Sequence, residues 1–175
     1  MHFGVIKPEF IDQIDHSKMN KWIYNFLEET KENVRIVHDH ALFKLIKGWE
    51  FNDGDLETLY CLAVPKQRDL MTIRDLKKEH LPLLKSMREE SLEAIEKKYG
   101  IKRCNIRAFF HYLPTYYHLH IHFVHVKMVQ TVSCHVGRAI LLDDVIDNIE
   151  LYSPNQDIGD YYQKKTIVQE IKGGT

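Results

Sequence analysis

The chain has 175 residues, of which 44% are apolar and 28% charged, and this composition is typical of one globular domain. Its 24 basic residues nearly balance its 25 acidic residues, which argues against a long basic stripe for a nucleic-acid backbone and favours a small ligand. Eleven histidines are many for this length, so the net charge rises steeply as the pH falls through about 6.5.

The first half of the chain is predicted to form one helix and three strands. Residues 1–15 show no clear period, and Ser17 is placed to cap the helix that follows. Asn52-Asp53-Gly54-Asp55 has the composition of a turn. The expected elements are a helix over 18–31 and strands over 34–36, 41–46 and 59–64, with residues 38–40 as the first turn.

The second half adds two further helices and three strands. Gly100 is suited to cap the C-terminus of the first of these helices, and Pro82 is tolerated near its start. The expected elements are helices over 78–99 and 138–149 and strands over 104–112, 118–127 and 166–171. Together these elements predict an α+β fold, an antiparallel sheet with a long crossover helix.

Three histidines alternate with apolar residues in the segment 118–124, His-Leu-His-Ile-His-Phe-Val. Side chains of a strand alternate between its faces, so His118, His120 and His122 are predicted to share one face at a spacing of about 6.6 Å. His125 has the opposite parity and is left out of this group.

Histidines on one open face can bind a metal, act on phosphate, or simply face solvent. A neutral imidazole is a nucleophile near neutral pH, and protonated neighbours can donate hydrogen bonds to phosphate oxygens. Zinc usually takes ligands from more than one segment, and no cysteine or glutamate is spaced to join these three. Phosphate chemistry is therefore favoured over a metal site, and we expect no metal and no cofactor.

The segment His-φ-His-φ-His-φ-φ, where φ is apolar, is the signature of the histidine-triad superfamily. The surrounding sequence 111–123 resembles the C-terminal domain of the scavenger mRNA-decapping enzymes. The resemblance runs from about residue 5 to 165, and it includes the segments 21–25, 73–76, 79–84 and 137–142. It implies a histidine-triad fold.

That family cleaves the triphosphate bridge of the mRNA cap or of a short capped oligonucleotide, releasing 7-methylguanosine monophosphate. The resemblance implies that His120 forms a covalent phosphohistidine intermediate, which water then hydrolyses. Protonated flanking histidines would support the reaction at neutral pH. The residues that would line the phosphates are His122, His118 and His111, joined by Thr115, Tyr116 and Arg138.

The base of the cap is cationic, so an aromatic face attracts it and a carboxylate can accept its hydrogen bonds. By resemblance, Trp22 is the stacking residue, Glu32 is the carboxylate, and Tyr60 matches a further pocket position. The segment 47–50, Lys-Gly-Trp-Glu, departs from the family's usual Pro-Asp-Leu-Lys. Trp49 stands where an aliphatic residue is usual, and we expect Trp22 and Trp49 to sandwich the methylated base.

Family members usually carry an N-terminal domain that swaps between subunits and closes over the substrate. The chain begins near the hinge, so residues 1–175 are expected to be a single catalytic domain without that lid, and to form a homodimer. Three alternatives stay open: a hydrolase of another dinucleoside polyphosphate, a catalytically weak cap-binding module, and a metal-binding histidine cluster.

The chain is expected to be cytoplasmic, and also nuclear in part. Its three cysteines form no Cys-x-x-Cys pair, which is typical of thiols in a reducing compartment. No apolar run approaches the roughly 20 residues that span a bilayer, so no membrane partner is expected.

Overall fold

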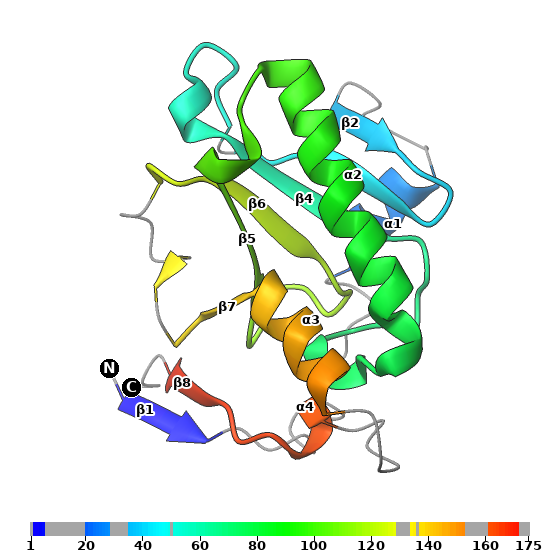
Figure 1. Cartoon of the computed structure of the whole chain (residues 1–175), viewed down its shortest axis with the longest axis vertical. Coiled ribbons are helices and arrows are strands. Elements are labelled where there is room, and N and C mark those ends of the chain that lie inside the picture. The colour runs from blue at the N-terminus through cyan, green and yellow to red at the C-terminus, as the bar shows by residue number, and fades with distance from the viewer. Residues whose placement is uncertain are drawn as a thin grey trace.

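The computed structural model describes residues 2–5, 20–28, 35–49, 51–128, 134–135, 137–152 and 161–171. Its main sheet has six antiparallel strands in the order β2-β3-β4-β6-β5-β7 (Figure 1). In chain order these are β2 (Ile36–Asp39), β3 (Phe43–Lys47), β4 (Tyr60–Pro65), β5 (Ile106–His111), β6 (Ile121–His125) and β7 (Ala139–Leu141). An antiparallel sheet within an α+β fold was predicted from the sequence, and the structure confirms it.

The long helix α2 (Leu81–Tyr99) connects β4 to β5 across one face of the sheet. Both strands are antiparallel to β6, which lies between them, so they run parallel to each other and need such a crossover. Pro82 lies in the first turn of α2, and Gly100 caps its end with a left-handed φ of 71°. The crossover helix and its predicted end at residue 99 are therefore confirmed, whereas the predicted start at residue 78 is not, because Lys78–His80 form a turn of 3-10 helix before α2 begins.

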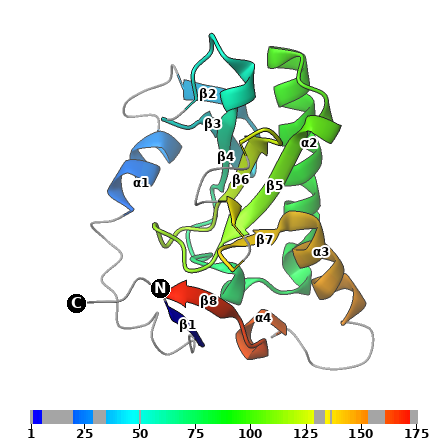
Figure 2. The same ribbon diagram turned by 90° about the vertical axis from the view of Figure 1, so that its left-hand side faces the viewer.

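Apolar residues cover both faces of the sheet. On one face, residues such as Phe43 and Phe123 pack against α2 and α3 (Leu142–Leu151) in the main core. On the other, Ile46 and Leu62 pack against Phe26 of the short helix α1 (Lys21–Leu27). Figure 2 shows α1 on one side of the sheet and α2 with α3 on the other. Beyond the end of α1, this second face is left for the functional site.

The remaining elements are short. A separate two-stranded sheet pairs β1 (His2–Val5) with β8 (Val168–Ile171), next to α4 (Tyr161–Lys164). The strand expected near 166–171 is thus confirmed, whereas its partner β1 falls in a segment without a recognisable period. Single turns of 3-10 helix cover Leu56–Thr58, Ile73–Asp75, Lys78–His80 and Arg103–Asn105. None of the described helices is both long and apolar enough to cross a bilayer.

Among the boundaries that differ from the sequence-based prediction, three change the assignment of particular residues. His38 and Asp39 belong to β2, because Asp39 pairs with Lys44 across the ladder, and the turn follows them. β6 begins only at Ile121, so residues 118–120, which were predicted to belong to this strand, precede it. Arg138 precedes β7 instead of starting a helix, because residues 139–141 pair with the edge of β5 and α3 begins after them.

Candidate active site

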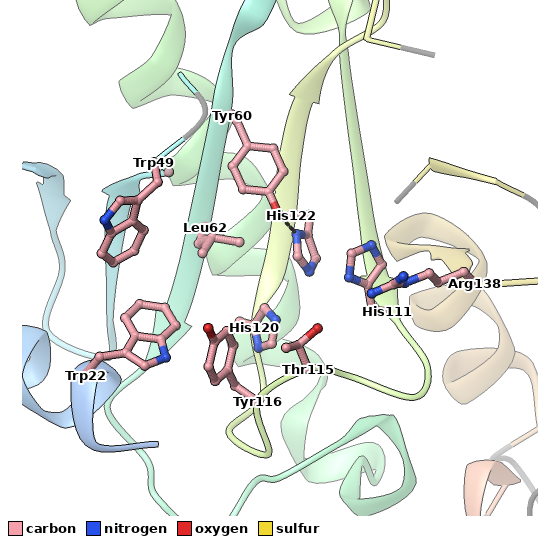
Figure 3. A pocket seen from close by; sticks show the side chains of 11 residues that line it. Trp22, Trp49, Tyr60, Leu62, His111, Thr115, Tyr116, His120, His122 and Arg138 are labelled. Carbon is pink, nitrogen blue, oxygen red and sulfur yellow. Dashed lines mark hydrogen bonds between the residues drawn. The ribbon is translucent and has the colours of Figure 1, made fainter. Parts of the chain in front are cut away.

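A cavity of about 530 Å³ opens on the α1 face of the sheet, where β4, β5 and β6 meet the loop that precedes β6. Residues of the three strands that face this side alternate with core residues, which is why His111 and His122 reach the cavity while Phe110 and Phe123 do not. The lining residues, drawn in Figure 3, are Trp22, Gly48, Trp49, Tyr60, Leu62, His111, Thr115, Tyr116, His120, His122 and Arg138.

The cavity contains nine of the eleven residues that were predicted to form the site. Glu32 lies outside the described residues, and His118 does not line the cavity. Gly48 and Leu62 also line it without having been predicted, since neither residue type signals chemistry in a sequence.

His120 has its proton placed by the backbone. Its Nδ1 lies 2.7 Å from the carbonyl oxygen of His118, and a carbonyl can only accept a hydrogen bond. Nδ1 therefore donates, and Nε2 of a neutral His120 carries the free lone pair. Burial lowers the pKa of this histidine below its ordinary value, which keeps Nε2 unprotonated at neutral pH. His120 thus has the tautomer that a nucleophile needs.

His122 lies beside His120, with 4.9 Å between their ring centroids. Its ring stacks on Phe109 at 5.2 Å, and its Nδ1 is 2.7 Å from the hydroxyl oxygen of Tyr60. Nε2 is buried and has no hydrogen-bond partner within the described part of the chain. This nitrogen is therefore available to a ligand in the cavity.

His118 is fully buried, but it lies apart from the other two histidines. Its Nε2 donates to the carbonyl oxygen of Pro65 at 2.8 Å, and its ring meets the edge of Tyr24. The prediction that three histidines share one face was wrong for this residue, because the chain bends at 115–118 and strand alternation starts only at β6. His118 contributes its carbonyl oxygen to His120 and not its imidazole to the cavity.

The far end of the cavity from the tryptophans is rich in potential donors. The His111 ring lies 3.9 Å from that of His122, and Figure 3 shows the Arg138 guanidinium reaching toward His111. Arg138 is placed there by its backbone, because its carbonyl oxygen accepts a hydrogen bond from the amide of Tyr112 at 3.1 Å. A guanidinium beside imidazoles suits the oxygens of a phosphate chain.

The other end of the cavity is aromatic. Trp22 on α1 lies 4.8 Å from Tyr116 and 5.3 Å from Trp49, measured between ring centroids. The two indoles are nearly perpendicular, at 85°, so a base can lie parallel to only one of them. The predicted sandwich is therefore not formed in this arrangement.

Trp49 has a second partner that the sequence did not suggest. The guanidinium of Arg35 lies 3.9 Å from the centre of its ring, and Trp49 is 56% exposed. A cation on that face covers it against a ligand, whereas Trp22 faces Tyr116 and the cavity (Figure 3). This favours Trp22 as the stacking surface.

Comparison with known proteins supplies the family. The model of the scavenger mRNA decapping enzyme C-terminal binding family matches residues 21–135, which include the whole of the histidine segment. The chain belongs to this family. The matched range contains Trp22, Trp49, His120 and His122, while Arg138 lies just beyond it.

Curated relatives agree with this assignment. The m7GpppX diphosphatase of Ascaris suum is 40% identical over 87% of this chain and 50% of its own length. That of Caenorhabditis elegans is 40% identical over 95% of this chain and 55% of its own length, and that of Homo sapiens is 37% identical over 87% and 44%. The chain thus spans about half the length of the curated relatives it matches.

Solved structures confirm the histidine-triad fold. A histidine-triad (HIT) family hydrolase from Legionella pneumophila aligns with a TM-score of 0.51 at 14% identity, covering 65% of this chain and 97% of its own. The aprataxin ortholog Hnt3 in complex with DNA aligns with a TM-score of 0.52 at 11% identity, covering 80% and 78%. At such identities the likeness concerns the fold alone.

The metal alternative was left open by the sequence. No group of three histidine, cysteine or acidic side chains has a metal-binding arrangement within the described ranges. The separation of His118 from His120 and His122 explains this for the histidine segment.

Stability should depend on these buried histidines. Burial lowers the pKa of His118, His120 and His122, that of His122 most strongly, whereas in an unfolded chain each titrates near about 6.5. As the pH falls below about 6.5, the unfolded chain takes up protons that the folded protein does not, so the free energy of unfolding decreases.

We therefore expect the melting temperature to fall between about pH 6.5 and pH 5, and the His122→Asn variant to lose less over that range. Thermal unfolding of both proteins in a pH series checks this. Equal losses in the two proteins would show that His122 does not titrate abnormally.

Proposed function

We propose that the chain hydrolyses the triphosphate bridge of a methylated mRNA cap, as a free cap dinucleotide or a short capped oligonucleotide. The observation that carries the proposal is the tautomer of His120, whose bare Nε2 lies in a cavity with the Arg138 guanidinium and two imidazoles at one end and aromatic rings at the other. The names of the curated relatives, m7GpppX diphosphatase, support the same reaction.

In the proposed reaction, Nε2 of His120 attacks the phosphorus that carries 7-methylguanosine. The bond from this phosphorus to the bridging oxygen breaks, and a nucleoside diphosphate leaves. The His118 carbonyl oxygen stabilises the positive charge on the His120 ring, since it accepts the Nδ1 proton throughout. Water then cleaves the phosphorus–nitrogen bond, which releases 7-methylguanosine monophosphate and restores His120.

The proposed roles of the remaining lining residues follow their positions. His111, His122 and Arg138 hold the phosphate oxygens, with Thr115 and Tyr116 beside them on the loop before β6. Trp22 stacks on the cationic base, and Glu32 accepts its hydrogen bonds, as the family resemblance implies. No proposed step uses a metal or a cofactor.

Burial corrects one detail of this mechanism. Protonated flanking histidines were expected from the sequence, but burial and the neighbouring His120, His111 and Arg138 lower the pKa of His122 well below its ordinary value. His122 is therefore neutral in the free protein at pH 7, and it can donate through only one nitrogen.

Turnover measurements separate this function from its alternatives. We expect cleavage of a methylated cap dinucleotide to 7-methylguanosine monophosphate, at a rate unchanged by a chelator and well above that for diadenosine polyphosphates. Faster cleavage of diadenosine polyphosphates would contradict the proposal. Tight binding without turnover would identify a cap-binding module.

We also propose that the protein acts as a homodimer in the cytoplasm and in part in the nucleus, in keeping with the family resemblance. Light scattering on the purified protein tests the dimer, and a monomer at the concentrations used for turnover would contradict it. Microscopy of the tagged protein tests the location.

A further inference from the structure

Tyr60 and His122 are diagonal neighbours on the cavity face of two paired strands. Leu62 of β4 lies opposite His122 of β6, which places Tyr60 two residues along from that pair. The Tyr60 hydroxyl reaches across to Nδ1 of His122, at 2.7 Å, as the dashed line in Figure 3 shows. The contact thus ties a residue at the rim of the cavity to a histidine at its floor.

Gly48 makes room for this position of the tyrosine. Its amide donates to the Tyr60 carbonyl oxygen at 2.8 Å, so the two backbones are closely held. A Cβ atom on residue 48 would lie 2.0 Å from Cδ1 of Tyr60, well inside van der Waals contact. Any other residue would force the ring aside, and Gly48 belongs to the segment in which this chain departs from the family pattern.

The two adjacent histidines need opposite tautomers for the proposed reaction. His120 must present a bare Nε2 to phosphorus, and the His118 carbonyl oxygen achieves this by accepting the proton on Nδ1. His122 faces the phosphates with a buried Nε2 that has no partner among the described residues. Phosphate oxygens accept hydrogen bonds, so this second Nε2 must carry a proton.

We propose that Tyr60 is a positioning residue whose hydroxyl donates a hydrogen bond to Nδ1 of His122 and thereby keeps the imidazole proton on Nε2, facing the phosphates. Gly48 provides the space that this contact requires. The inference rests on the proposed function and extends it, because it assigns the group that sets the donor state of His122. Without the hydroxyl, the proton can move to Nδ1, and a lone pair on Nε2 would then face the phosphate oxygens.

Burial makes the choice of tautomer consequential. The pKa of His122 is lowered well below its ordinary value, chiefly by burial. At neutral pH the ring is therefore neutral and carries one proton, so only one of its two nitrogens can donate a hydrogen bond. In a histidine that binds a ligand through one ring nitrogen, the hydrogen bond made by the other ring nitrogen commonly decides which of the two is protonated.

The test reads the tautomer directly. Nitrogen-15 spectra of the ligand-free protein, labelled at histidine, distinguish a protonated ring nitrogen from a bare one. We expect His122 to be protonated at Nε2 in the wild type and in Tyr152→Phe, a matched control at the exposed end of α3. In Tyr60→Phe we expect the proton to shift in part or fully to Nδ1. A His122 protonated at Nδ1 in the wild type, or unchanged in Tyr60→Phe, would overturn the inference.

Kinetics of the same proteins supply a second readout. Tyr60→Phe should lower kcat for the cap dinucleotide by about 10- to 100-fold, the usual range for loss of such an orienting partner, with a smaller change in KM. Gly48→Ala should reproduce both the spectral change and the loss in kcat. If the wild type does not cleave the cap, the proposed function fails, whereas the spectra still show which nitrogen of His122 carries the proton when Tyr60 is present.

Discussion

The His120→Asn variant is expected to lose at least about 10³-fold in kcat for a methylated cap dinucleotide, since asparagine has no ring nitrogen with which to form the proposed covalent intermediate. Binding of 7-methylguanosine monophosphate should stay within about threefold of the wild type, because the aromatic end of the cavity is untouched. Product analysis gives the first quantity and equilibrium titration the second.

His125→Asn is the matched control for this variant. His125 ends β6, the strand that directly follows His120, but lies outside the cavity. Its Nδ1 accepts a hydrogen bond from the amide of Lys127, which an asparagine oxygen can also do. Turnover by this control should be close to that of the wild type. Substantial turnover by His120→Asn would contradict the proposed mechanism.

The Trp22→Ala variant is expected to raise the Kd for 7-methylguanosine monophosphate by about 30-fold, which corresponds to roughly 2 kcal/mol. Trp22 borders the cavity and contacts Tyr116, so truncating it removes the main surface on which the base can stack. The loss should be smaller for unmethylated guanosine monophosphate, whose neutral base has no cation–π attraction to lose.

Trp49→Ala is the comparison that interprets this result. Because Trp49 is half-exposed and Arg35 covers one face of it, we expect its truncation to raise Kd by no more than about fivefold. Equal losses in the two variants would show that Trp49 turns to complete the sandwich, and stacking on Trp22 alone would then be wrong.

The local sequence pattern was sufficient to predict which side chains face the core in the regular strands. Alternation in the histidine segment correctly placed Ile121 and Phe123 in the core and His122 on the opposite face, and it left His125 outside the cavity. Family resemblance then added His111, which lies far from the triad in spacing but 3.9 Å from His122 in space.

The sequence pattern failed for His118 and Arg35, because contacts between distant parts of the chain decide where these two residues lie. The loop before β6 is held by Asn20, which donates to the Tyr117 carbonyl oxygen, and by the Leu119 amide, which donates to the carbonyl oxygen of Leu70. These contacts turn His118 away from the cavity, and nothing within 118–124 encodes them. Likewise, Arg35 is adjacent to Trp49 only because β2 and β3 pair, and a lone arginine carries no signal of that.

The central claim is that His120 becomes covalently attached to the substrate, and mass spectrometry of the rapidly quenched protein tests it most directly. During turnover of a methylated cap dinucleotide, we predict a 7-methylguanylyl adduct on the peptide that contains His120, absent from the His120→Asn protein. Cleavage that proceeds with no adduct, or with an adduct on another residue, would contradict the mechanism.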